Sequence, residues 1–454
     1  MKLGLTYSNV LLVPKKTFLS SRSEADIKTR FTRNVSLNIP LVSSNMASVT
    51  EHKMAIAMAR EGGLGVIHQF GARGEQVEEV KKVKHSTSYV IDDPVCIGVG
   101  ANVTEAVSKM KNDGVTSLLV KEGEELVGIF TSKDYLFEEN WEKPLVEVMT
   151  PKERLITAPY GIGTEEAKKV LRQHRIEKLP LMQDGRLRGL MTTKDIKRLE
   201  QWPDACRDEK GRLRVGAAIG VKDTLDRARE LVSAGVDVLV LDVAHAHSEI
   251  VIQRLKELKA NFKVDIMVGN IATAEAAQVC STRIISGAGV PQLTAIMDVV
   301  AVAKEYGVPV TADGGLKYPG DVSKAIAGGA STIYSGSFFA GTDESPGMVI
   351  MKDGRRYKQY FGSASYQSSH LRKENERGKL VKERLDVFVE GVSNLVDYKG
   401  PVSEVINGLV RGLSSGVSYC GARNIKEMQE KAEFIRITMA GWKESNTSGM
   451  KMSE

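Results

Sequence analysis

Residues Val236–Asn270 read VDVLVLDVAHAHSEIVIQRLKELKANFKVDIMVGN. The near-continuous apolar runs Val236–Asp242 and Val264–Asn270 are typical of parallel strands that are covered on both faces. Between them, Ser248–Ala260 has the apolar spacing of an amphipathic helix. The stretch therefore predicts a strand–helix–strand unit, the building block of parallel α/β folds.

The same kind of strand recurs along the chain. Five further runs have this character: Ile39–Asn45, Gly63–His68, Leu213–Gly220, Val308–Asp313 and Ser331–Gly336. Regular alternation of such strands with helices predicts a (β/α)₈ barrel. A doubly wound open sheet is the alternative, but none of the strands is followed by the GxGxxG turn expected there.

An internal repeat interrupts the predicted barrel after its second strand. Residues Gly128–Asp134 (GIFTSKD) return 61 residues later as Gly189–Asp195 (GLMTTKD). Each copy predicts helix, strand, turn, strand and helix. We therefore expect four segments, namely the first part of the barrel (1–87), one repeat (88–148), a second repeat (149–200) and the rest of the barrel (201–454).

Composition narrows the class of protein. The chain is 42% hydrophobic and 26% charged, and its net charge of +6 is spread along it, so nucleic acid is not an expected partner. The four cysteines form no CxxC pair, so we expect neither a metal site nor a disulfide framework. No apolar run approaches the roughly 18 residues of a membrane span. Because the start also lacks a signal-peptide pattern, we expect a cytoplasmic protein.

Several motifs together resemble one family. The order of Tyr7–Pro14, Asp313-Gly-Gly, Gly336-Ser337, Glu344–Gly347 and Tyr398–Pro401 is similar to that of the IMP dehydrogenase/GMP reductase family. The repeats resemble a pair of CBS modules. The resemblance implies a barrel enzyme that acts on a purine nucleoside monophosphate (GMP or IMP) with a nicotinamide dinucleotide, as a homotetramer.

Cys280-Ser281-Thr282 carries the predicted chemistry. A thiolate is nucleophilic and forms near neutral pH, although a lone cysteine is more often a small buried apolar residue. The resemblance makes Cys280 the nucleophile that attacks purine C2, and in a reductase it gives Thr282 and Glu344 the handling of protons on the leaving amine.

The resemblance also assigns the binding residues. Phosphate binding at the ends of late barrel strands favours glycines, which let the backbone approach an oxyanion closely. The substrate residues implied are Asn45, Met46, Asp313, Gly314, Gly315, Gly336, Ser337, Tyr360, Gly362 and Ser363. The cofactor residues implied are Asp242, His245, Asn270 and Glu344. The pair His245 and His247 could suggest a metal, but no third ligand has suitable spacing.

The direction of the reaction depends on a flap expected at 366–390. In the family's dehydrogenases an Arg-Tyr pair on the flap activates water, and no such pair occurs in this segment. We therefore expect a GMP reductase that uses NADPH to convert GMP to IMP and ammonia. The alternative is an IMP dehydrogenase that uses NAD and, as in the family, a potassium ion.

One stretch departs from the family. Only nine residues separate Asn270 from Cys280, whereas a helix, a sixth strand and a loop should precede the cysteine. Gln278 and Val279 precede Cys280 where the family has a Gly-rich loop. We therefore expect the sixth barrel strand to be missing, so a second class of protein, a nucleotide sensor without catalysis, stays open. Its adenine or guanine nucleotide would contact Thr131, Asp134, Thr192 and Asp195, which could instead cap helices.

Overall fold

The computed structural model describes residues 3–86, 90–91, 94–271, 273, 289–361 and 393–445. The chain divides into two compact units. Unit 1 comprises Met1–Ser86, Asp204–Asp208 and Leu213–Glu454, and unit 2 comprises Thr87–Pro203 and Glu209–Arg212.

Unit 1 is built on a parallel sheet of seven strands, and all seven predicted runs form it. Their order in the sheet is β15-β14-β13-β5-β4-β17-β16. β4 (Leu41–Ser43) and β5 (Leu64–Ile67) lie at its centre beside β13 (Gly216–Ile219). The remaining strands are β14 (Val238–Asp242), β15 (Asp265–Gly269), β16 (Thr311–Asp313) and β17 (Thr332–Ser335). The sheet curls, as in the predicted (β/α)₈ barrel, and this fold class is confirmed.

The described sheet is open along one line, which we call the seam. Among the described residues, β15 pairs with β14 alone and β16 pairs with β17 alone. All five residues of β15 are partly exposed, whereas the first four residues of β14 are buried. The seam therefore lies between the fifth and sixth of the seven strands in chain order, where the sequence predicts that a strand is missing.

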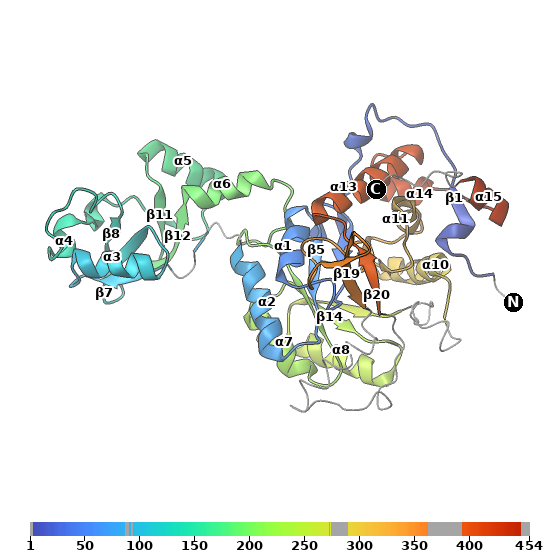
Figure 1. Ribbon diagram of the computed structural model, residues 1–454, viewed down its shortest axis with the longest axis horizontal. Coiled ribbons are helices and arrows are strands. Elements are labelled where there is room, and N and C mark those ends of the chain that lie inside the picture. Colours follow the sequence, from blue (N-terminus) through green and yellow to red (C-terminus); the bar gives the residue numbers. More distant parts are fainter. Residues whose placement is uncertain are drawn as a thin grey trace. The chain divides into compact units, whose positions relative to one another are not determined.

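Helices cover the outer face of this sheet (Figure 1). They are α1 (His52–Arg60), α2 (Arg73–Ser86), α7 (Thr224–Ser233), α8 (Glu249–Asn261), α10 (Gln292–Ala303), α11 (Pro319–Ala327) and α13 (Val402–Tyr419). α13 buries Leu409, Leu413 and Val417, one turn apart, in the largest apolar core. On the helices that precede β15 and β16, Ile250, Ile252, Met297 and Val302 are exposed.

The rest of unit 1 consists of short elements. β1 (Val10–Leu12) pairs with β21 (Phe434–Arg436), and β2 (Thr29–Arg30) pairs with β3 (Ser36–Leu37). A small antiparallel sheet contains β18 (Ile350–Lys352), β19 (Arg355–Phe361) and β20 (Ser393–Asp397). α14 (Ile425–Lys431) and α15 (Met439–Glu444) end the described chain. Over the described ranges, no helix is long and apolar enough to cross a membrane.

Unit 2 contains the two repeats. The first has α3 (Val103–Asn112), β7 (Ser117–Glu122), β8 (Glu125–Thr131) and the short α4 (Leu145–Val148), with β6 (Cys96–Gly98) and β9 (Thr150–Pro151) at its sheet edges. The second has β10 (Ala158–Pro159), α5 (Thr164–His174), β11 (Lys178–Gln183), β12 (Arg186–Thr192) and α6 (Thr193–Gln201). The hairpins shift register at Val120/Lys121 and at Leu181/Met182, which are equivalent positions. The sequence repeat is therefore also a structural one.

Candidate active site

Polar side chains gather where the parallel strands of unit 1 end. Asn45 follows β4, Asp242 ends β14 and Asp313 ends β16. Asn45 is 2% exposed, and its Nδ2 donates to Oδ2 of Asp242 at 2.8 Å. The carboxyl ends of parallel strands share one edge of the sheet, which is where α/β barrels place their reacting groups.

A second amide supports Asp242. Asn270, just after β15, donates from Nδ2 to the carbonyl of Val243 at 3.0 Å and to Oδ1 of Asp242 at 3.5 Å. Two of the residues expected to meet a cofactor, Asp242 and Asn270, are thus brought together. His245 is exposed, and its ring lies 6.3 Å from that of His247. No group of three His, Cys, Asp or Glu residues suited to a metal ion occurs among the described residues.

The carboxyl group of Asp313 has an unusual ionisation. Burial, and secondarily repulsion from the Asp242 carboxylate, raise its pKa to about 7. The carbonyl oxygen of Asp313 accepts a 2.6 Å hydrogen bond from Nε2 of Gln292 on α10, which fixes the backbone at the end of β16. A carboxyl group that titrates near neutral pH can accept a hydroxyl proton when ionised and donate one when protonated.

The expected phosphate residues form a narrow cradle around Gly336. A Cβ at this position would overlap the sulfur of Met46, and it would lie 2.9 Å from Oγ of Ser44 and 3.3 Å from the hydroxyl of Tyr360. The Ser44 hydroxyl is buried and has no hydrogen-bond partner among the described residues. Only glycine fits here, and hydroxyl groups converge on its Cα, as an oxyanion site requires.

The glycines after β16 have backbone conformations that favour glycine. Gly314 has φ +68° and Gly315 has φ +73°, so a side chain at either position would be strained. Ser337 is exposed, and its carbonyl accepts a hydrogen bond from Nζ of Lys399 at 2.8 Å.

Glu344 lies in a turn that a buried lysine organises. Nζ of Lys358 donates to the carbonyls of Thr342 (2.8 Å), Asp343 (3.2 Å) and Ser345 (2.7 Å). Burial lowers the pKa of Lys358. Oε2 of Glu344 accepts from the backbone N–H of Val402 at 2.8 Å, at the start of α13. Among the described residues, Glu344 bonds to the backbone of Val402 and to neither Asp242 nor Asp313.

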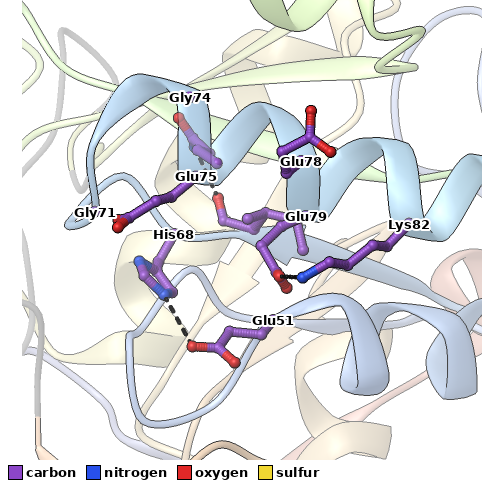
Figure 2. Close-up of a pocket in the computed structure, with 10 residues that line it drawn as sticks. Glu51, His68, Gly71, Gly74, Glu75, Glu78, Glu79 and Lys82 are labelled. Carbon is purple, nitrogen blue, oxygen red and sulfur yellow. Dashed lines mark hydrogen bonds and ion pairs between the residues drawn. The ribbon is translucent and has the colours of Figure 1, made fainter.

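His68, after β5, faces a different pocket, of about 510 Å³. Figure 2 shows its ring directed at Glu51, with Nε2 3.8 Å from the carboxylate, and Glu79 paired with Lys82. The lining carries the carboxylates Glu51, Glu75, Glu78 and Glu79 against the single cation Lys82 and His68. So many carboxylates disfavour a nucleotide phosphate, so we do not place the substrate there.

Two of the three described cysteines are poor nucleophiles. Burial raises the pKa of Cys206 to about 12 and also raises the pKa of Cys420. Sγ of Cys96 donates to the carbonyl of Pro94 at 3.1 Å. The expected nucleophile Cys280 lies outside the described residues, as do Thr282, Gly362, Ser363 and the flap 366–390.

Comparison with known proteins decides the family. A model of the IMP dehydrogenase/GMP reductase domain matches residues 4–448. The chain belongs to this family. Its enzymes with curated names include inosine-5'-monophosphate dehydrogenases from Aquifex aeolicus (46% identity; 100% of this chain and 97% of the relative) and Nitrosopumilus maritimus (44%; 98% of each). A crystal structure of a Trypanosoma brucei GMP reductase variant with guanosine 5'-monophosphate superposes with a TM-score of 0.85 at 40% identity, covering 99% of both chains.

These relatives correct one expectation. The prediction of a GMP reductase with NADPH is wrong, because the curated family members that align along this chain at 41–46% identity are named as dehydrogenases. That prediction rested mainly on one dipeptide missing from the flap, together with the resemblance of Tyr360–Ser365 and Asn45-Met46 to reductases. Short motifs of this kind carry less information than identity along the whole chain.

The alignments also bear on the seam. The alignment with the Aquifex dehydrogenase is 480 residues long, and this chain has 454 residues. At least 26 positions of the alignment are therefore gaps in this chain. A helix and a strand of ordinary length need about 20 residues. The difference in length is therefore large enough to hold the strand–helix unit that this sequence lacks.

In unit 2, the expected nucleotide residues of the first repeat bond to each other. The carboxylate of Asp134 accepts hydrogen bonds from the backbone N–H of Thr131 at 2.6 Å and from its hydroxyl at 2.9 Å. Thr192 ends β12, and Asp195 lies on α6.

Two family-site residues were missed by the sequence reasoning. Ser44 precedes the expected Asn45-Met46 pair, and the phenol of Tyr334 contacts Asn45. Ser44 and Tyr334 lie in or beside apolar strand patterns, which predict core packing rather than a role at the site. A polar residue within two positions of a strand's carboxyl end was the available signal for both.

Proposed function

We propose that this chain is an IMP dehydrogenase, which oxidises inosine monophosphate to xanthosine monophosphate with NAD. The observation that carries the proposal is the 41–46% identity, along the whole chain, to relatives named as this enzyme. The polar strand ends of unit 1 support it, because they offer separate places for a nucleotide phosphate, a ribose and a second ligand.

The purine nucleotide would bind between β16 and β17. Ionised Asp313 suits the ribose hydroxyls, since a carboxylate accepts two hydrogen bonds. The hydroxyls of Ser44 and Tyr360 would donate to the phosphate at Gly336. By family resemblance, Gly314, Gly315, Ser337, Gly362 and Ser363 complete this site, and Asn45 and Met46 line it.

Cys280 would be the nucleophile. Its thiolate bonds to purine C2, and a hydride leaves C2 for the nicotinamide. Water then adds at C2 and the thiolate leaves, which gives the xanthine ring and restores the cysteine. Thr282 and Glu344 would hold protons during these steps. The raised pKa of Cys206 and of Cys420 supports the choice, since neither is a competent nucleophile at neutral pH.

NAD, when bound, supplies the hydride acceptor. Asp242 would take hydroxyls of the dinucleotide, with Asn270 holding the carboxylate and His245 at the exposed rim. The residues of this chain do not fit a potassium ion as well as they fit NAD. Gln278 and Val279 stand where the family's Gly-rich carbonyl loop would hold the ion, so we assign it no step.

For unit 2 we infer a pair of CBS modules, at 88–148 and 149–200, that binds adenine or guanine nucleotides. Thr131 and Asp134 would contact the ribose, as would Thr192 and Asp195. In the first repeat, such a ligand would compete with the bonds between Thr131 and Asp134. We also infer a homotetramer, which sedimentation of the full chain tests.

Turnover assays test the enzyme. IMP with NAD should give rising absorbance of reduced nicotinamide, whereas GMP with NADPH should give no change. Cys280→Ala should abolish the signal, and Cys420→Ala, at a buried thiol, is the matched control that should retain it. Oxidation of NADPH with GMP, or full activity in Cys280→Ala, would overturn the proposal.

A further inference from the structure

Tyr334 brings a phenol into the floor of the candidate site. It lies on β17, is 5% exposed, and follows the apolar residue Ile333. Its hydroxyl accepts a hydrogen bond from the backbone N–H of Asn45 at 3.0 Å and donates one to Oδ1 of Asn45 at 2.9 Å. The phenol has one proton, so donation to Oδ1 uses it.

This contact sets the orientation of the Asn45 amide. Because Oδ1 faces the phenol, Nδ2 must face the opposite way, and there it donates to Oδ2 of Asp242 at 2.8 Å. Two other hydrogen bonds from described residues to Asp242 are longer: the one from Asn270 is 3.5 Å long, and the one from Gln69 to the backbone carbonyl is 3.4 Å long. A chain of hydrogen bonds thus runs from Tyr334 through Asn45 to the carboxylate.

The first two residues of this hydrogen-bond chain are buried, and the third is partly exposed to solvent. Tyr334 and Asn45 are 5% and 2% exposed, whereas Asp242 is partly exposed. Leaving a buried amide or N–H group unpaired is costly, so the orientation of the Asn45 amide is well determined. A fixed amide restricts the rotation of the carboxylate that it holds.

We propose that Tyr334 is a positioning residue for Asp242, acting through Asn45, and that it controls affinity for the nicotinamide dinucleotide rather than for the purine nucleotide. This rests on the proposed function, because it takes Asp242 as the group that meets the dinucleotide. Among the described residues, the Tyr334 hydroxyl bonds to Asn45 and to neither Asp313 nor the side chains around Gly336. The ribose and phosphate contacts of the purine site should therefore be spared when the phenol hydroxyl is lost.

Tyr334→Phe removes the hydroxyl alone. We expect the KM for NAD to rise about five- to tenfold, the cost of one weakened hydrogen bond to a charged group, and the KM for IMP to change less than about twofold.

Thr332→Val is the matched control. Thr332 lies two residues earlier on β17, is fully buried, and shares a 2.8 Å hydrogen bond between hydroxyl groups with Thr311. Its loss should lower stability without changing the ratio of the two KM values. Equal changes in both KM values in Tyr334→Phe would overturn the proposal. A rise in the KM for NAD without a rise in the KM for IMP in Thr332→Val would also overturn it.

Measurements of dinucleotide binding test this proposal independently of the proposed enzyme activity. If the wild-type protein turns over no IMP, titration with NAD, NADH and NADPH still measures dinucleotide affinity. Weaker binding in Tyr334→Phe, with nucleotide monophosphate affinity unchanged, would then support the positioning role while the dehydrogenase assignment fails. Unchanged dinucleotide affinity in that variant, or no dinucleotide binding by the wild-type protein, would overturn the positioning role.

Discussion

The ammonium group of Lys84 lies 2.6 Å from Oδ2 of Asp237 and 3.1 Å from Oδ2 of Asp208. Lys84 is 1% exposed, and it comes two residues before α2 ends. Asp208 belongs to the short segment with which the chain re-enters unit 1, and Asp237 comes directly before β14. One buried cation thus joins three separate parts of unit 1.

Loss of that cation should be costly. Lys84→Met removes the cation from beside two carboxylates that are only 13% and 12% exposed, and we expect the free energy of unfolding to fall by about 3–5 kcal/mol in urea titrations. Lys82→Met is the matched control, because Lys82 pairs with Glu79 from a side chain that is 52% exposed. That variant should lose less than about 1 kcal/mol. Similar losses in the two variants would contradict the account.

Asp313 should make stability depend on pH. Its folded pKa of about 7 lies above the ordinary aspartate pKa of 3.8, so the folded state keeps a proton that the unfolded state releases. The contribution of Asp313 to stability therefore falls as pH rises from about 4 to about 7. Asp313→Asn cannot ionise, so its stability relative to the wild type should increase between about pH 4 and about pH 7, measured as the difference in unfolding free energy. A difference that does not change with pH would contradict the raised pKa.

Gly336 should tolerate no side chain. Gly336→Ala places a methyl group against Met46, Ser44 and Tyr360, so we expect the stabilisation of the protein by IMP in a thermal shift assay to be lost. Gly320→Ala, on α11, is the control, since nothing lies within 4 Å of its added Cβ. It should keep the full IMP shift. An unchanged IMP shift in Gly336→Ala would show that phosphate binds elsewhere.

The seam should be visible in hydrogen exchange. In a parallel sheet, N–H groups along a strand point alternately to its two neighbours, and described β15 has a neighbour on one side only. Peptides covering β15 should therefore exchange about tenfold faster than those covering β14. Inserting the corresponding segment of the Aquifex relative between Asn270 and Cys280 should slow hydrogen exchange in β15. Equal protection of the two strands in the unmodified chain would show that the seam is closed.

The strands of unit 1 were predictable because apolar runs between turns indicate strands that are buried on both faces. The repeat was also predictable, since Gly128–Asp134 and Gly189–Asp195 fall at equivalent places in β8 and β12 and the residues after them. The contacts of Asn45 were not, because they depend on Tyr334, which lies 289 residues away in sequence. The reaction direction was mistaken because it was inferred from a few short motifs, chiefly a dipeptide missing from the flap, which lies outside the described residues.

The most direct test of the account is the initial rate with IMP and NAD, followed by absorbance of reduced nicotinamide and compared with Cys280→Ala. The account predicts reduced nicotinamide and xanthosine monophosphate in equal amounts from the wild-type protein, and neither product from the variant. Absence of both products from a wild-type protein that binds IMP and NAD would contradict it.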